Sequence, residues 1–528
     1  MTQEPIRELT IEETERALSK MIKQGISAEA KNTLTQSVFL VGFALLLQAP
    51  NTVIGILAAI PYVTQLLQIP SIFLIERFRN RRKLNVLTQL GNRLGILFMA
   101  LIPFFATGQI GLVLLIGAMT IQSVFTAIGS PSWNSWLTDL VPPDRLGRFF
   151  SKRLSMMGLI SIVGSVLGGY FITRWMAGID STEIGPQLQG YSIIFFVAFL
   201  FGMIAIYFTI SSPEPPLMTR QDRVSYSKLI TEPFQDKNYR NLMKFSAVWD
   251  LSTTFSAPFF TVYLLDVNIL DLSVAIVAGL VALTQLTSVI FLRLWGRLTD
   301  RFSNKSILQV ALPLYVIGTF LWTFTLIAKE YGLLIPLIVM IHILNGFSSA
   351  GVNLSSSNIG MKLAPRGKTA SYLAAKGSIG AIVGTIAPIT AGMLADVFAP
   401  HTIDFSISWF IGGELFTLIP TYRLSGISFL FLISTIIGIY AIHRITLVNE
   451  PGEVEERVVL EALIAETRRN VRTVSTVDGL RQTFQVPLKV TKKKLKKKKD
   501  SERQRIDKET AHDSPDEQGV QNPKLTDT

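Results

Sequence analysis

Long apolar stretches separated by short polar ones make up most of this chain. A bilayer core is crossed by roughly 20 mostly apolar helical residues, and stretches of about this length recur between residues 33 and 442. This pattern predicts about twelve membrane-spanning helices, at residues 33–48, 53–75, 84–106, 110–137, 154–175, 191–211, 242–265, 272–295, 307–328, 333–355, 369–398 and 424–442. The first stretch is short, because its continuous apolar part runs only from Val38 to Leu47. Twelve crossings are therefore preferred, and eleven are the alternative.

Lysine and arginine residues are concentrated in alternate loops between the predicted spans. One set of loops holds most of them: Arg77, Arg79, Arg81, Arg82 and Lys83; Arg145, Arg148, Lys152 and Arg153; Arg220, Arg223, Lys228, Lys237 and Arg240; Arg297, Arg301 and Lys305; Lys362, Arg366 and Lys368. The opposite loops hold few, chiefly Arg174, Lys329 and Arg423. Short cytoplasmic loops carry such an excess of bases. We therefore predict a multi-pass protein of the cell membrane with both termini in the cytoplasm.

The composition agrees with a membrane protein, since 49% of the 528 residues are hydrophobic, 17% are charged and the mean hydropathy is +0.40. The net charge of +12 does not indicate a nucleic-acid partner, because the bases lie in short loops and in the C-terminal tail. That tail contains "KVTKKKLKKKKDSERQR", which is expected to be disordered and either solvated or bound to anionic lipid headgroups. With 0 cysteines and 4 histidines in the chain, neither a metal nor a cofactor is expected.

Two similar charged stretches indicate an internal repeat. "FLIERFRNRRK" contains Glu76 and Arg77, and "RLTDRFSNKS" contains Asp300 and Arg301, with the acids 300 − 76 = 224 positions apart. Each acid follows the second predicted span of its half. The expected division is an N-terminal cytoplasmic segment (1–32), a six-helix bundle (33–211), a cytoplasmic linker (212–241), a second six-helix bundle (242–445) and a cytoplasmic tail (446–528). The stretches "GSVLGG" and "GTIAPITAG" are expected to allow close helix packing.

These features resemble the major facilitator superfamily of secondary transporters, and its poorly characterised bacterial members in particular. The loop signature of that family is Gly-x-x-x-Asp-Arg-x-Gly-Arg-Arg, which Gly296, Asp300 and Arg301 match in the second half. The first copy is degenerate, with Glu76 in place of the aspartate and Ile72 in place of the first glycine. The resemblance implies an all-α membrane protein in which two pseudo-symmetric six-helix bundles tilt about a central site.

A cytoplasmic gate is the function expected of the charged stretches. Paired acids and bases at helix ends can form charge-assisted hydrogen bonds that hold one side of a transporter closed. In the first half the candidates are Glu76, Arg77, Asp139 and Arg148. In the second half they are Gly296, Asp300 and Arg301, with Lys362, Arg366 and Lys368 as partners, and Asp300 is expected to be the more sensitive. The alternative is that these charges set only the membrane topology.

Ionisable and polar residues inside the predicted spans are candidates for binding a solute or a proton, because inserting a charge into a membrane is costly. Asp250 lies in the seventh span and Lys376 at similar depth in the eleventh. Asp250 is expected to contact a substrate or a coupling proton, to form a structural pair with Lys376, or to snorkel. Gln122, His342 and Asn345 lie in the fourth and tenth spans, which line the cavity in the family that the chain resembles. Arg93, in the third span, is expected to snorkel or to pair.

The resulting hypothesis is a secondary active transporter that moves a small solute, with H⁺ or Na⁺ as candidate coupling ions. A monomer is expected. No Gly-x-x-x-x-Gly-Lys-Ser/Thr loop for ATP occurs in the chain, so a gradient would drive the solute. An enzyme is disfavoured because no cluster of catalytic residue types gathers at one membrane face. A receptor or scaffold of the same fold that does not transport is the alternative.

Overall fold

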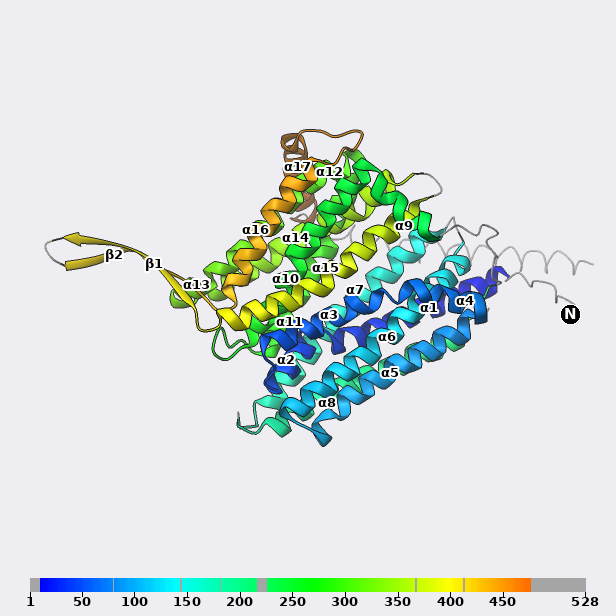
Figure 1. Cartoon of the computed structure of the whole chain (residues 1–528), viewed down its shortest axis with the longest axis horizontal. Coiled ribbons are helices and arrows are strands. Elements are labelled where there is room, and N and C mark those ends of the chain that lie inside the picture. The colour runs from blue at the N-terminus through cyan, green and yellow to red at the C-terminus, as the bar shows by residue number, and fades with distance from the viewer. Residues whose placement is uncertain are drawn as a thin grey trace, which may run out of the picture. The chain divides into compact units, whose positions relative to one another are not determined.

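A computed structural model describes residues 10–78, 80–142, 145–180, 182–215, 226–365, 368–411 and 414–475. These residues are almost entirely helical (Figure 1). The helices of the first half are α1 (Ile11–Thr35), α2 (Val38–Leu46), α3 (Asn51–Gln65), α4 (Gln68–Phe78), α5 (Arg81–Phe105), α6 (Gly108–Leu140), α7 (Leu146–Met176) and α8 (Ile184–Ile210). Those that follow are α9 (Tyr226–Gln235), α10 (Lys237–Leu265), α11 (Val274–Arg301), α12 (Asn304–Leu321), the short 3₁₀ helix η2 (Trp322–Phe324), α13 (Thr325–Glu330), α14 (Leu334–Leu363), α15 (Thr369–Phe398), α16 (Ser428–Thr446) and α17 (Glu456–Ser475).

Ten helical segments of the described chain are long and apolar enough to cross a membrane. The helical membrane fold predicted from the sequence is thereby confirmed. The two remaining predicted spans correspond to α1 with α2, and to α10, which are the first helices of the two halves. Helices α1 and α10 carry polar residues along their length, whereas α2 is apolar but only 9 residues long because the backbone breaks at Ser37.

The first predicted span differs from the prediction, because it belongs to a longer and broken helix. Helix α1 begins far upstream at Ile11, with a Thr10–Glu13 capping box, and it packs against α7 and α8. The backbone then breaks at Ser37, whose φ is 51°, before α2 continues. Residues 11–32, expected as a separate N-terminal segment, are thus part of a helix that contacts the first bundle. Ala17 and Met21, one helical turn apart, are both buried there.

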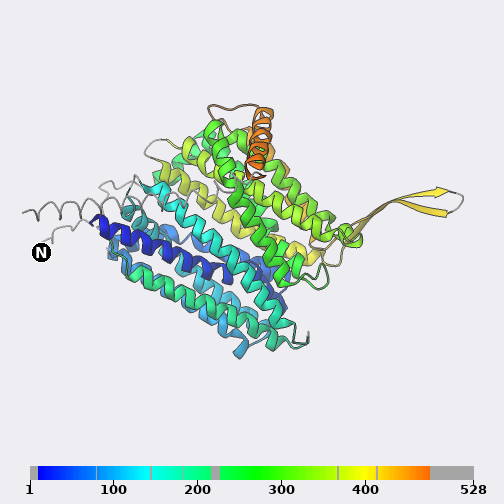
Figure 2. The same ribbon diagram turned by 180° about the vertical axis from the view of Figure 1, so that it is seen from behind.

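A β-hairpin interrupts the helical pattern between α15 and α16. Strands β1 (Thr402–Ile411) and β2 (Glu414–Ser425) pair antiparallel, with Thr402 opposite Ser425. The hairpin extends away from the neighbouring helices in both views (Figures 1 and 2). The helical fold class holds for the rest of the described chain, and this hairpin is an addition that the pattern of apolar spans did not predict.

The two halves meet through two equivalent pairs of helices. Helix α3 packs against α15, and α7 packs against α11, while the helices of each half otherwise contact mainly their own half. The glycines at these contacts permit close backbone approach, since a Cβ on Gly55 would lie 2.1 Å from the Pro388 carbonyl oxygen and one on Gly169 would lie 2.6 Å from Ala278 Cβ. Pro388 and Gly169 lie in the two small-residue stretches, so these stretches do form close helix contacts.

Candidate functional site

A cavity of about 590 Å³ lies where the two halves meet. Its walls come from α1, α2, α3, α6 and α10, together with the α1–α2 junction, Gln68 at the start of α4 and Pro388 of α15. Among its polar lining residues are Lys31, Asn32, Gln36, Ser37, Tyr62, Thr64, Gln65, Gln68, Gln122, Ser123, Thr126, Ser130, Thr254 and Thr261. The volume falls within the range of small-molecule sites, and the lining supplies amide and hydroxyl groups that can hydrogen-bond a solute.

The residues predicted for a solute site are only partly brought together. Gln122 lines the cavity. Asp250 is half-buried on α10, one turn before the cavity residue Thr254, whose hydroxyl donates to the Asp250 carbonyl oxygen at 2.6 Å. Lys376 Nζ donates to the Ser356 carbonyl oxygen at 2.8 Å and to its hydroxyl at 3.1 Å. Asp250 and Lys376 form no direct ion pair in the described structure, but their charges lie close enough to interact electrostatically.

His342 and Asn345 lie outside the cavity, within the second bundle. The His342 ring contacts Trp322, and its Nδ1 lies 2.7 Å from the Thr284 hydroxyl. Asn345 faces α12, where its Oδ1 would lie 2.2 Å from a Cβ on Gly318. Helix α14 supplies no residue to the described lining of the cavity. The two side chains instead contact α11, through Thr284, and α12, through Gly318.

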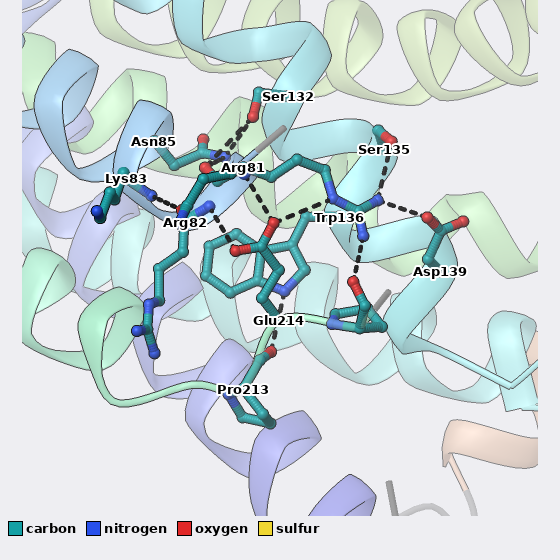
Figure 3. A network of polar contacts seen from close by, with 12 residues as sticks. Arg81, Arg82, Lys83, Asn85, Ser132, Ser135, Trp136, Asp139, Pro213 and Glu214 are labelled. Atoms are coloured by element: carbon teal, nitrogen blue, oxygen red, sulfur yellow. Dashed lines mark hydrogen bonds and ion pairs between the residues drawn. The ribbon is translucent and has the colours of Figure 1, made fainter. Parts of the chain in front are cut away.

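A buried arginine organises the end of the first bundle where the charged stretch lies (Figure 3). The Arg81 side chain is 0% exposed, and its Nη1 lies 2.5 Å from Asp139 Oδ2 at the end of α6. The same nitrogen donates to Ser135 Oγ at 3.1 Å, and Nη2 donates to the Pro215 carbonyl oxygen at 2.6 Å. Arg81 Nε lies 3.6 Å from Glu214. One guanidinium thus joins the start of α5, the end of α6 and the segment after α8.

Glu214 also caps helix α5. Its carboxylate accepts the backbone N–H of Arg81 at 2.7 Å and that of Arg82 at 3.1 Å. A carboxylate at this place satisfies unpaired N–H groups and interacts favourably with the helix dipole. Trp136 Nε1 donates to the Pro213 carbonyl oxygen at 3.1 Å, which holds the capping segment against α6 (Figure 3).

The second bundle repeats this arrangement with different residues. Lys305 lies 305 − 81 = 224 positions after Arg81, and Glu450 caps its helix by accepting the Lys305 backbone N–H at 2.7 Å. Asn304 Nδ2 and Lys362 Nζ donate to the same carboxylate at 3.0 and 2.8 Å. Lys305 Nζ lies 2.8 Å from Glu453. Burial acts to raise the pKa of Glu450, but these hydrogen bonds outweigh it and hold the pKa below its ordinary value.

Of the predicted gate residues, Asp139 belongs to the cluster around Arg81. Its partner there is Arg81, and not Glu76 or Arg77. Arg77, Arg148 and Asp300 are exposed. The Arg301 guanidinium lies 5.1 Å from the ring centroid of Phe302, and a Cβ on Gly296 would meet open space. The side chain of Glu76, and the predicted partner Arg366, lie outside the described residues.

Sequence reasoning missed Glu214 and Glu450 because neither acid lies beside the repeated charged stretches. A signal was nevertheless present. Each half ends its sixth helix shortly before a Glu-Pro pair, Glu214–Pro215 and Glu450–Pro451. Each pair joins groups of its own bundle, so the clusters link helices within a half.

Hydrogen bonds between the halves lie at the opposite end of the helices. Asp396, near the end of α15, accepts the backbone N–H groups of Asn51 and Thr52, each at 2.9 Å, and the Thr52 hydroxyl at 2.6 Å. It therefore caps α3 of the other half, whose own N-cap, Pro50, offers no side-chain acceptor. Ala275 N–H at the start of α11 donates to Thr173 Oγ1 near the end of α7 at 2.9 Å. We call this the Asp396 end, and the opposite one the Arg81 end.

Two helical halves of related construction, with a cavity where they meet, are the architecture of a class of integral membrane transport proteins. The sequence matches the Major Facilitator Superfamily over residues 30–388. The chain belongs to this superfamily of membrane transporters.

Solved structures of other transporters share the fold. A bacterial homolog of the human lysosomal transporter Spinster, in an inward-facing and occupied conformation, is 13% identical with a TM-score of 0.60, over 85% of this chain and 97% of that one. A bacterial homologue of the iron transporter ferroportin is also 13% identical, with a TM-score of 0.59, over 83% of this chain and 99% of that one. A mutant of the nucleoside transporter NupG is 12% identical, with a TM-score of 0.58, over 82% of this chain and 100% of that one. None of the curated proteins searched matches the sequence.

Proposed function

We propose that this protein is a secondary active transporter that moves a small solute by alternating access, with the two bundles rocking about the central cavity. The observation that carries the proposal is the cross-bundle cap at Asp396. It holds the halves together at one end of a cavity that extends along α3 from Ile54 to Gln65 and on to Gln68. Breaking three hydrogen bonds to one carboxylate would release that end, as rigid-body rocking requires.

The Arg81 and Lys305 clusters have a different role in this proposal from the gate first expected. Since they tie helices within each half, they keep each bundle rigid while the halves move. Asp300 and Arg77 are exposed charges at the same end, and they would pair across the halves when this end closes.

Orientation and energy coupling complete the proposal. The excess of bases at the Arg81 end supports a cytoplasmic location for that end and for both termini in the cell membrane. Asp250, half-buried one turn from the cavity, is the proposed site for a coupling H⁺ or Na⁺. The protein is proposed to act as a monomer, and its basic tail to contact anionic headgroups.

Reconstitution into liposomes tests the proposal. Purified protein is assayed for uptake across a library of labelled solutes, with imposed H⁺ and Na⁺ gradients and with empty liposomes as the control. We expect gradient-dependent accumulation of at least one solute. Solute-induced thermal stabilisation without any uptake would instead support a receptor or scaffold.

A further inference from the structure

Two buried cations share one neutral acceptor in the wall of the cavity. Lys31 of α1 is 6% exposed and Arg93 of α5 is 5% exposed. Lys31 Nζ lies 3.5 Å from Asn92 Oδ1, and Arg93 Nη1 donates to the same oxygen at 2.9 Å. The Lys31 distance is at the outer limit of a hydrogen bond. Arg93 thus neither snorkels nor pairs with an acid, contrary to the expectation from its place in the third span.

The charges of this cluster are not balanced by a carboxylate in contact. Arg93 Nε is buried without a hydrogen-bond partner. Glu29 is the nearest acid along α1; it hydrogen-bonds Asn32 and interacts electrostatically with Lys31 at a distance, without a direct ion pair to Lys31 or Arg93. Buried charges are normally paired. Lys31 and Arg93 share only one amide oxygen, so both side chains have N–H groups that can still donate to an anionic partner.

Open space adjoins these groups. A second cavity of about 250 Å³ is lined by Lys31, Arg93 and Arg153 together with amides and hydroxyls, and no carboxylate belongs to its described lining. The central cavity shares four of these lining residues, namely Lys31, Asn32, Thr126 and Ser130. A solute in the central cavity therefore has Lys31 within its wall and Arg93 behind it.

We propose that the solute carries an anionic group, a carboxylate or a phosphate, that binds to Lys31 and Arg93. This inference rests on the proposed transport function and names the chemical class of the substrate. A guanidinium and an ammonium together form charge-assisted hydrogen bonds with such oxygens. The same two charges repel a cationic solute, which gives the site selectivity as well as affinity.

Thermal unfolding of the purified full chain in detergent tests the proposal. The probes are inorganic phosphate, acetate and succinate, compared with chloride at equal ionic strength and with the neutral acetamide and succinamide. We expect at least one of the three anions to raise the unfolding temperature saturably and its neutral counterpart to have no effect. The increase should be lost in Lys31→Gln and Arg93→Gln and retained in Lys31→Arg. Lys152→Gln, which removes an exposed base of the same bundle, is the matched control and should behave as wild type.

Two results would overturn the inference. One is that phosphate, acetate and succinate all act as chloride does on the wild type. The other is that the stabilisation persists in Lys31→Gln, which is informative even if Arg93→Gln does not fold. Uptake in liposomes separates this inference from the proposed function. Saturable anion binding without uptake of that anion contradicts transport alone, whereas uptake of a neutral or cationic solute unaffected by Lys31→Gln contradicts the anionic class alone.

Discussion

Arg81 illustrates how one residue can determine the stability of a bundle end. Its fully buried guanidinium is held by two carboxylates, a hydroxyl and a carbonyl oxygen. Removing one member of a buried charged cluster leaves the others unpaired. We expect Arg81→Gln to lower the free energy of unfolding by on the order of 3 kcal/mol, measured by denaturant titration in detergent. Arg82→Gln, which removes the adjacent exposed side chain, should have little effect, and equal losses in both variants would contradict this account.

Glu450 gives the second bundle a pH-dependent stability. Its pKa lies below the ordinary value, because hydrogen bonds from Lys362, Lys305 and Asn304 outweigh the effect of burial. The ionised form therefore stabilises the fold at neutral pH, and this contribution is lost as the pH falls through the lowered pKa. We expect Glu450→Gln to unfold at a lower temperature than wild type at pH 7, and the difference to shrink as the pH falls below about 4.

Glu455→Gln is the control for that measurement, since Glu455 is an exposed acid of the same segment. A difference between Glu450→Gln and wild type that stays constant from neutral to acidic pH would argue against ionised Glu450 as the stabilising form.

At the scale of elements, the contact between α3 and α15 determines whether the Asp396 end can close. A Cβ on Gly55 would lie 2.1 Å from a backbone oxygen of α15, and a backbone atom cannot rotate away as a side chain can. We expect Gly55→Ala to separate these helices and to shift the protein toward a conformation open at this end. Because the chain has 0 cysteines, spin labels at Gln48→Cys and Pro400→Cys would report the longer distance.

Gly117→Ala on α6 is the matched control, since a Cβ there meets nothing within 4 Å. An unchanged distance distribution in Gly55→Ala would show that the interface accommodates the methyl group without opening.

The first helices of the two halves are elements whose sequences alone were misleading. Helices α1 and α10 are too polar, and α2 at 9 residues too short, to be among the ten clear spans, yet all three supply walls of the cavity. Several of the polar residues of α1 and α10, namely Lys31, Asn32, Thr254 and Thr261, line that cavity. In α1 and α10, low hydropathy therefore indicated helices that line the candidate site.

At the scale of the whole molecule, Asp300 tests whether the Arg81 end closes during transport. It is exposed here, so its substitution should not weaken this conformation. We expect Asp300→Asn to reduce uptake in liposomes about tenfold, equivalent to roughly 1.4 kcal/mol, with unchanged membrane insertion and unfolding temperature. Lys83→Gln, another exposed charge at this end, serves as the control. If Asp300→Asn takes up solute at the wild-type rate, the Asp300 charge has no role in closing this end, and only the membrane-topology alternative remains.

Hydropathy, loop charge and the 224-position repeat were enough to predict a helical membrane protein of two related halves. Hydropathy and loop charge are local features, since each segment enters the membrane according to its own composition. Only the tertiary structure decided which charges meet. Arg81 is 133 positions from Glu214, and Asn51 is 345 positions from Asp396. Such pairings depend on how complete helices pack, which the residues around each charge do not encode.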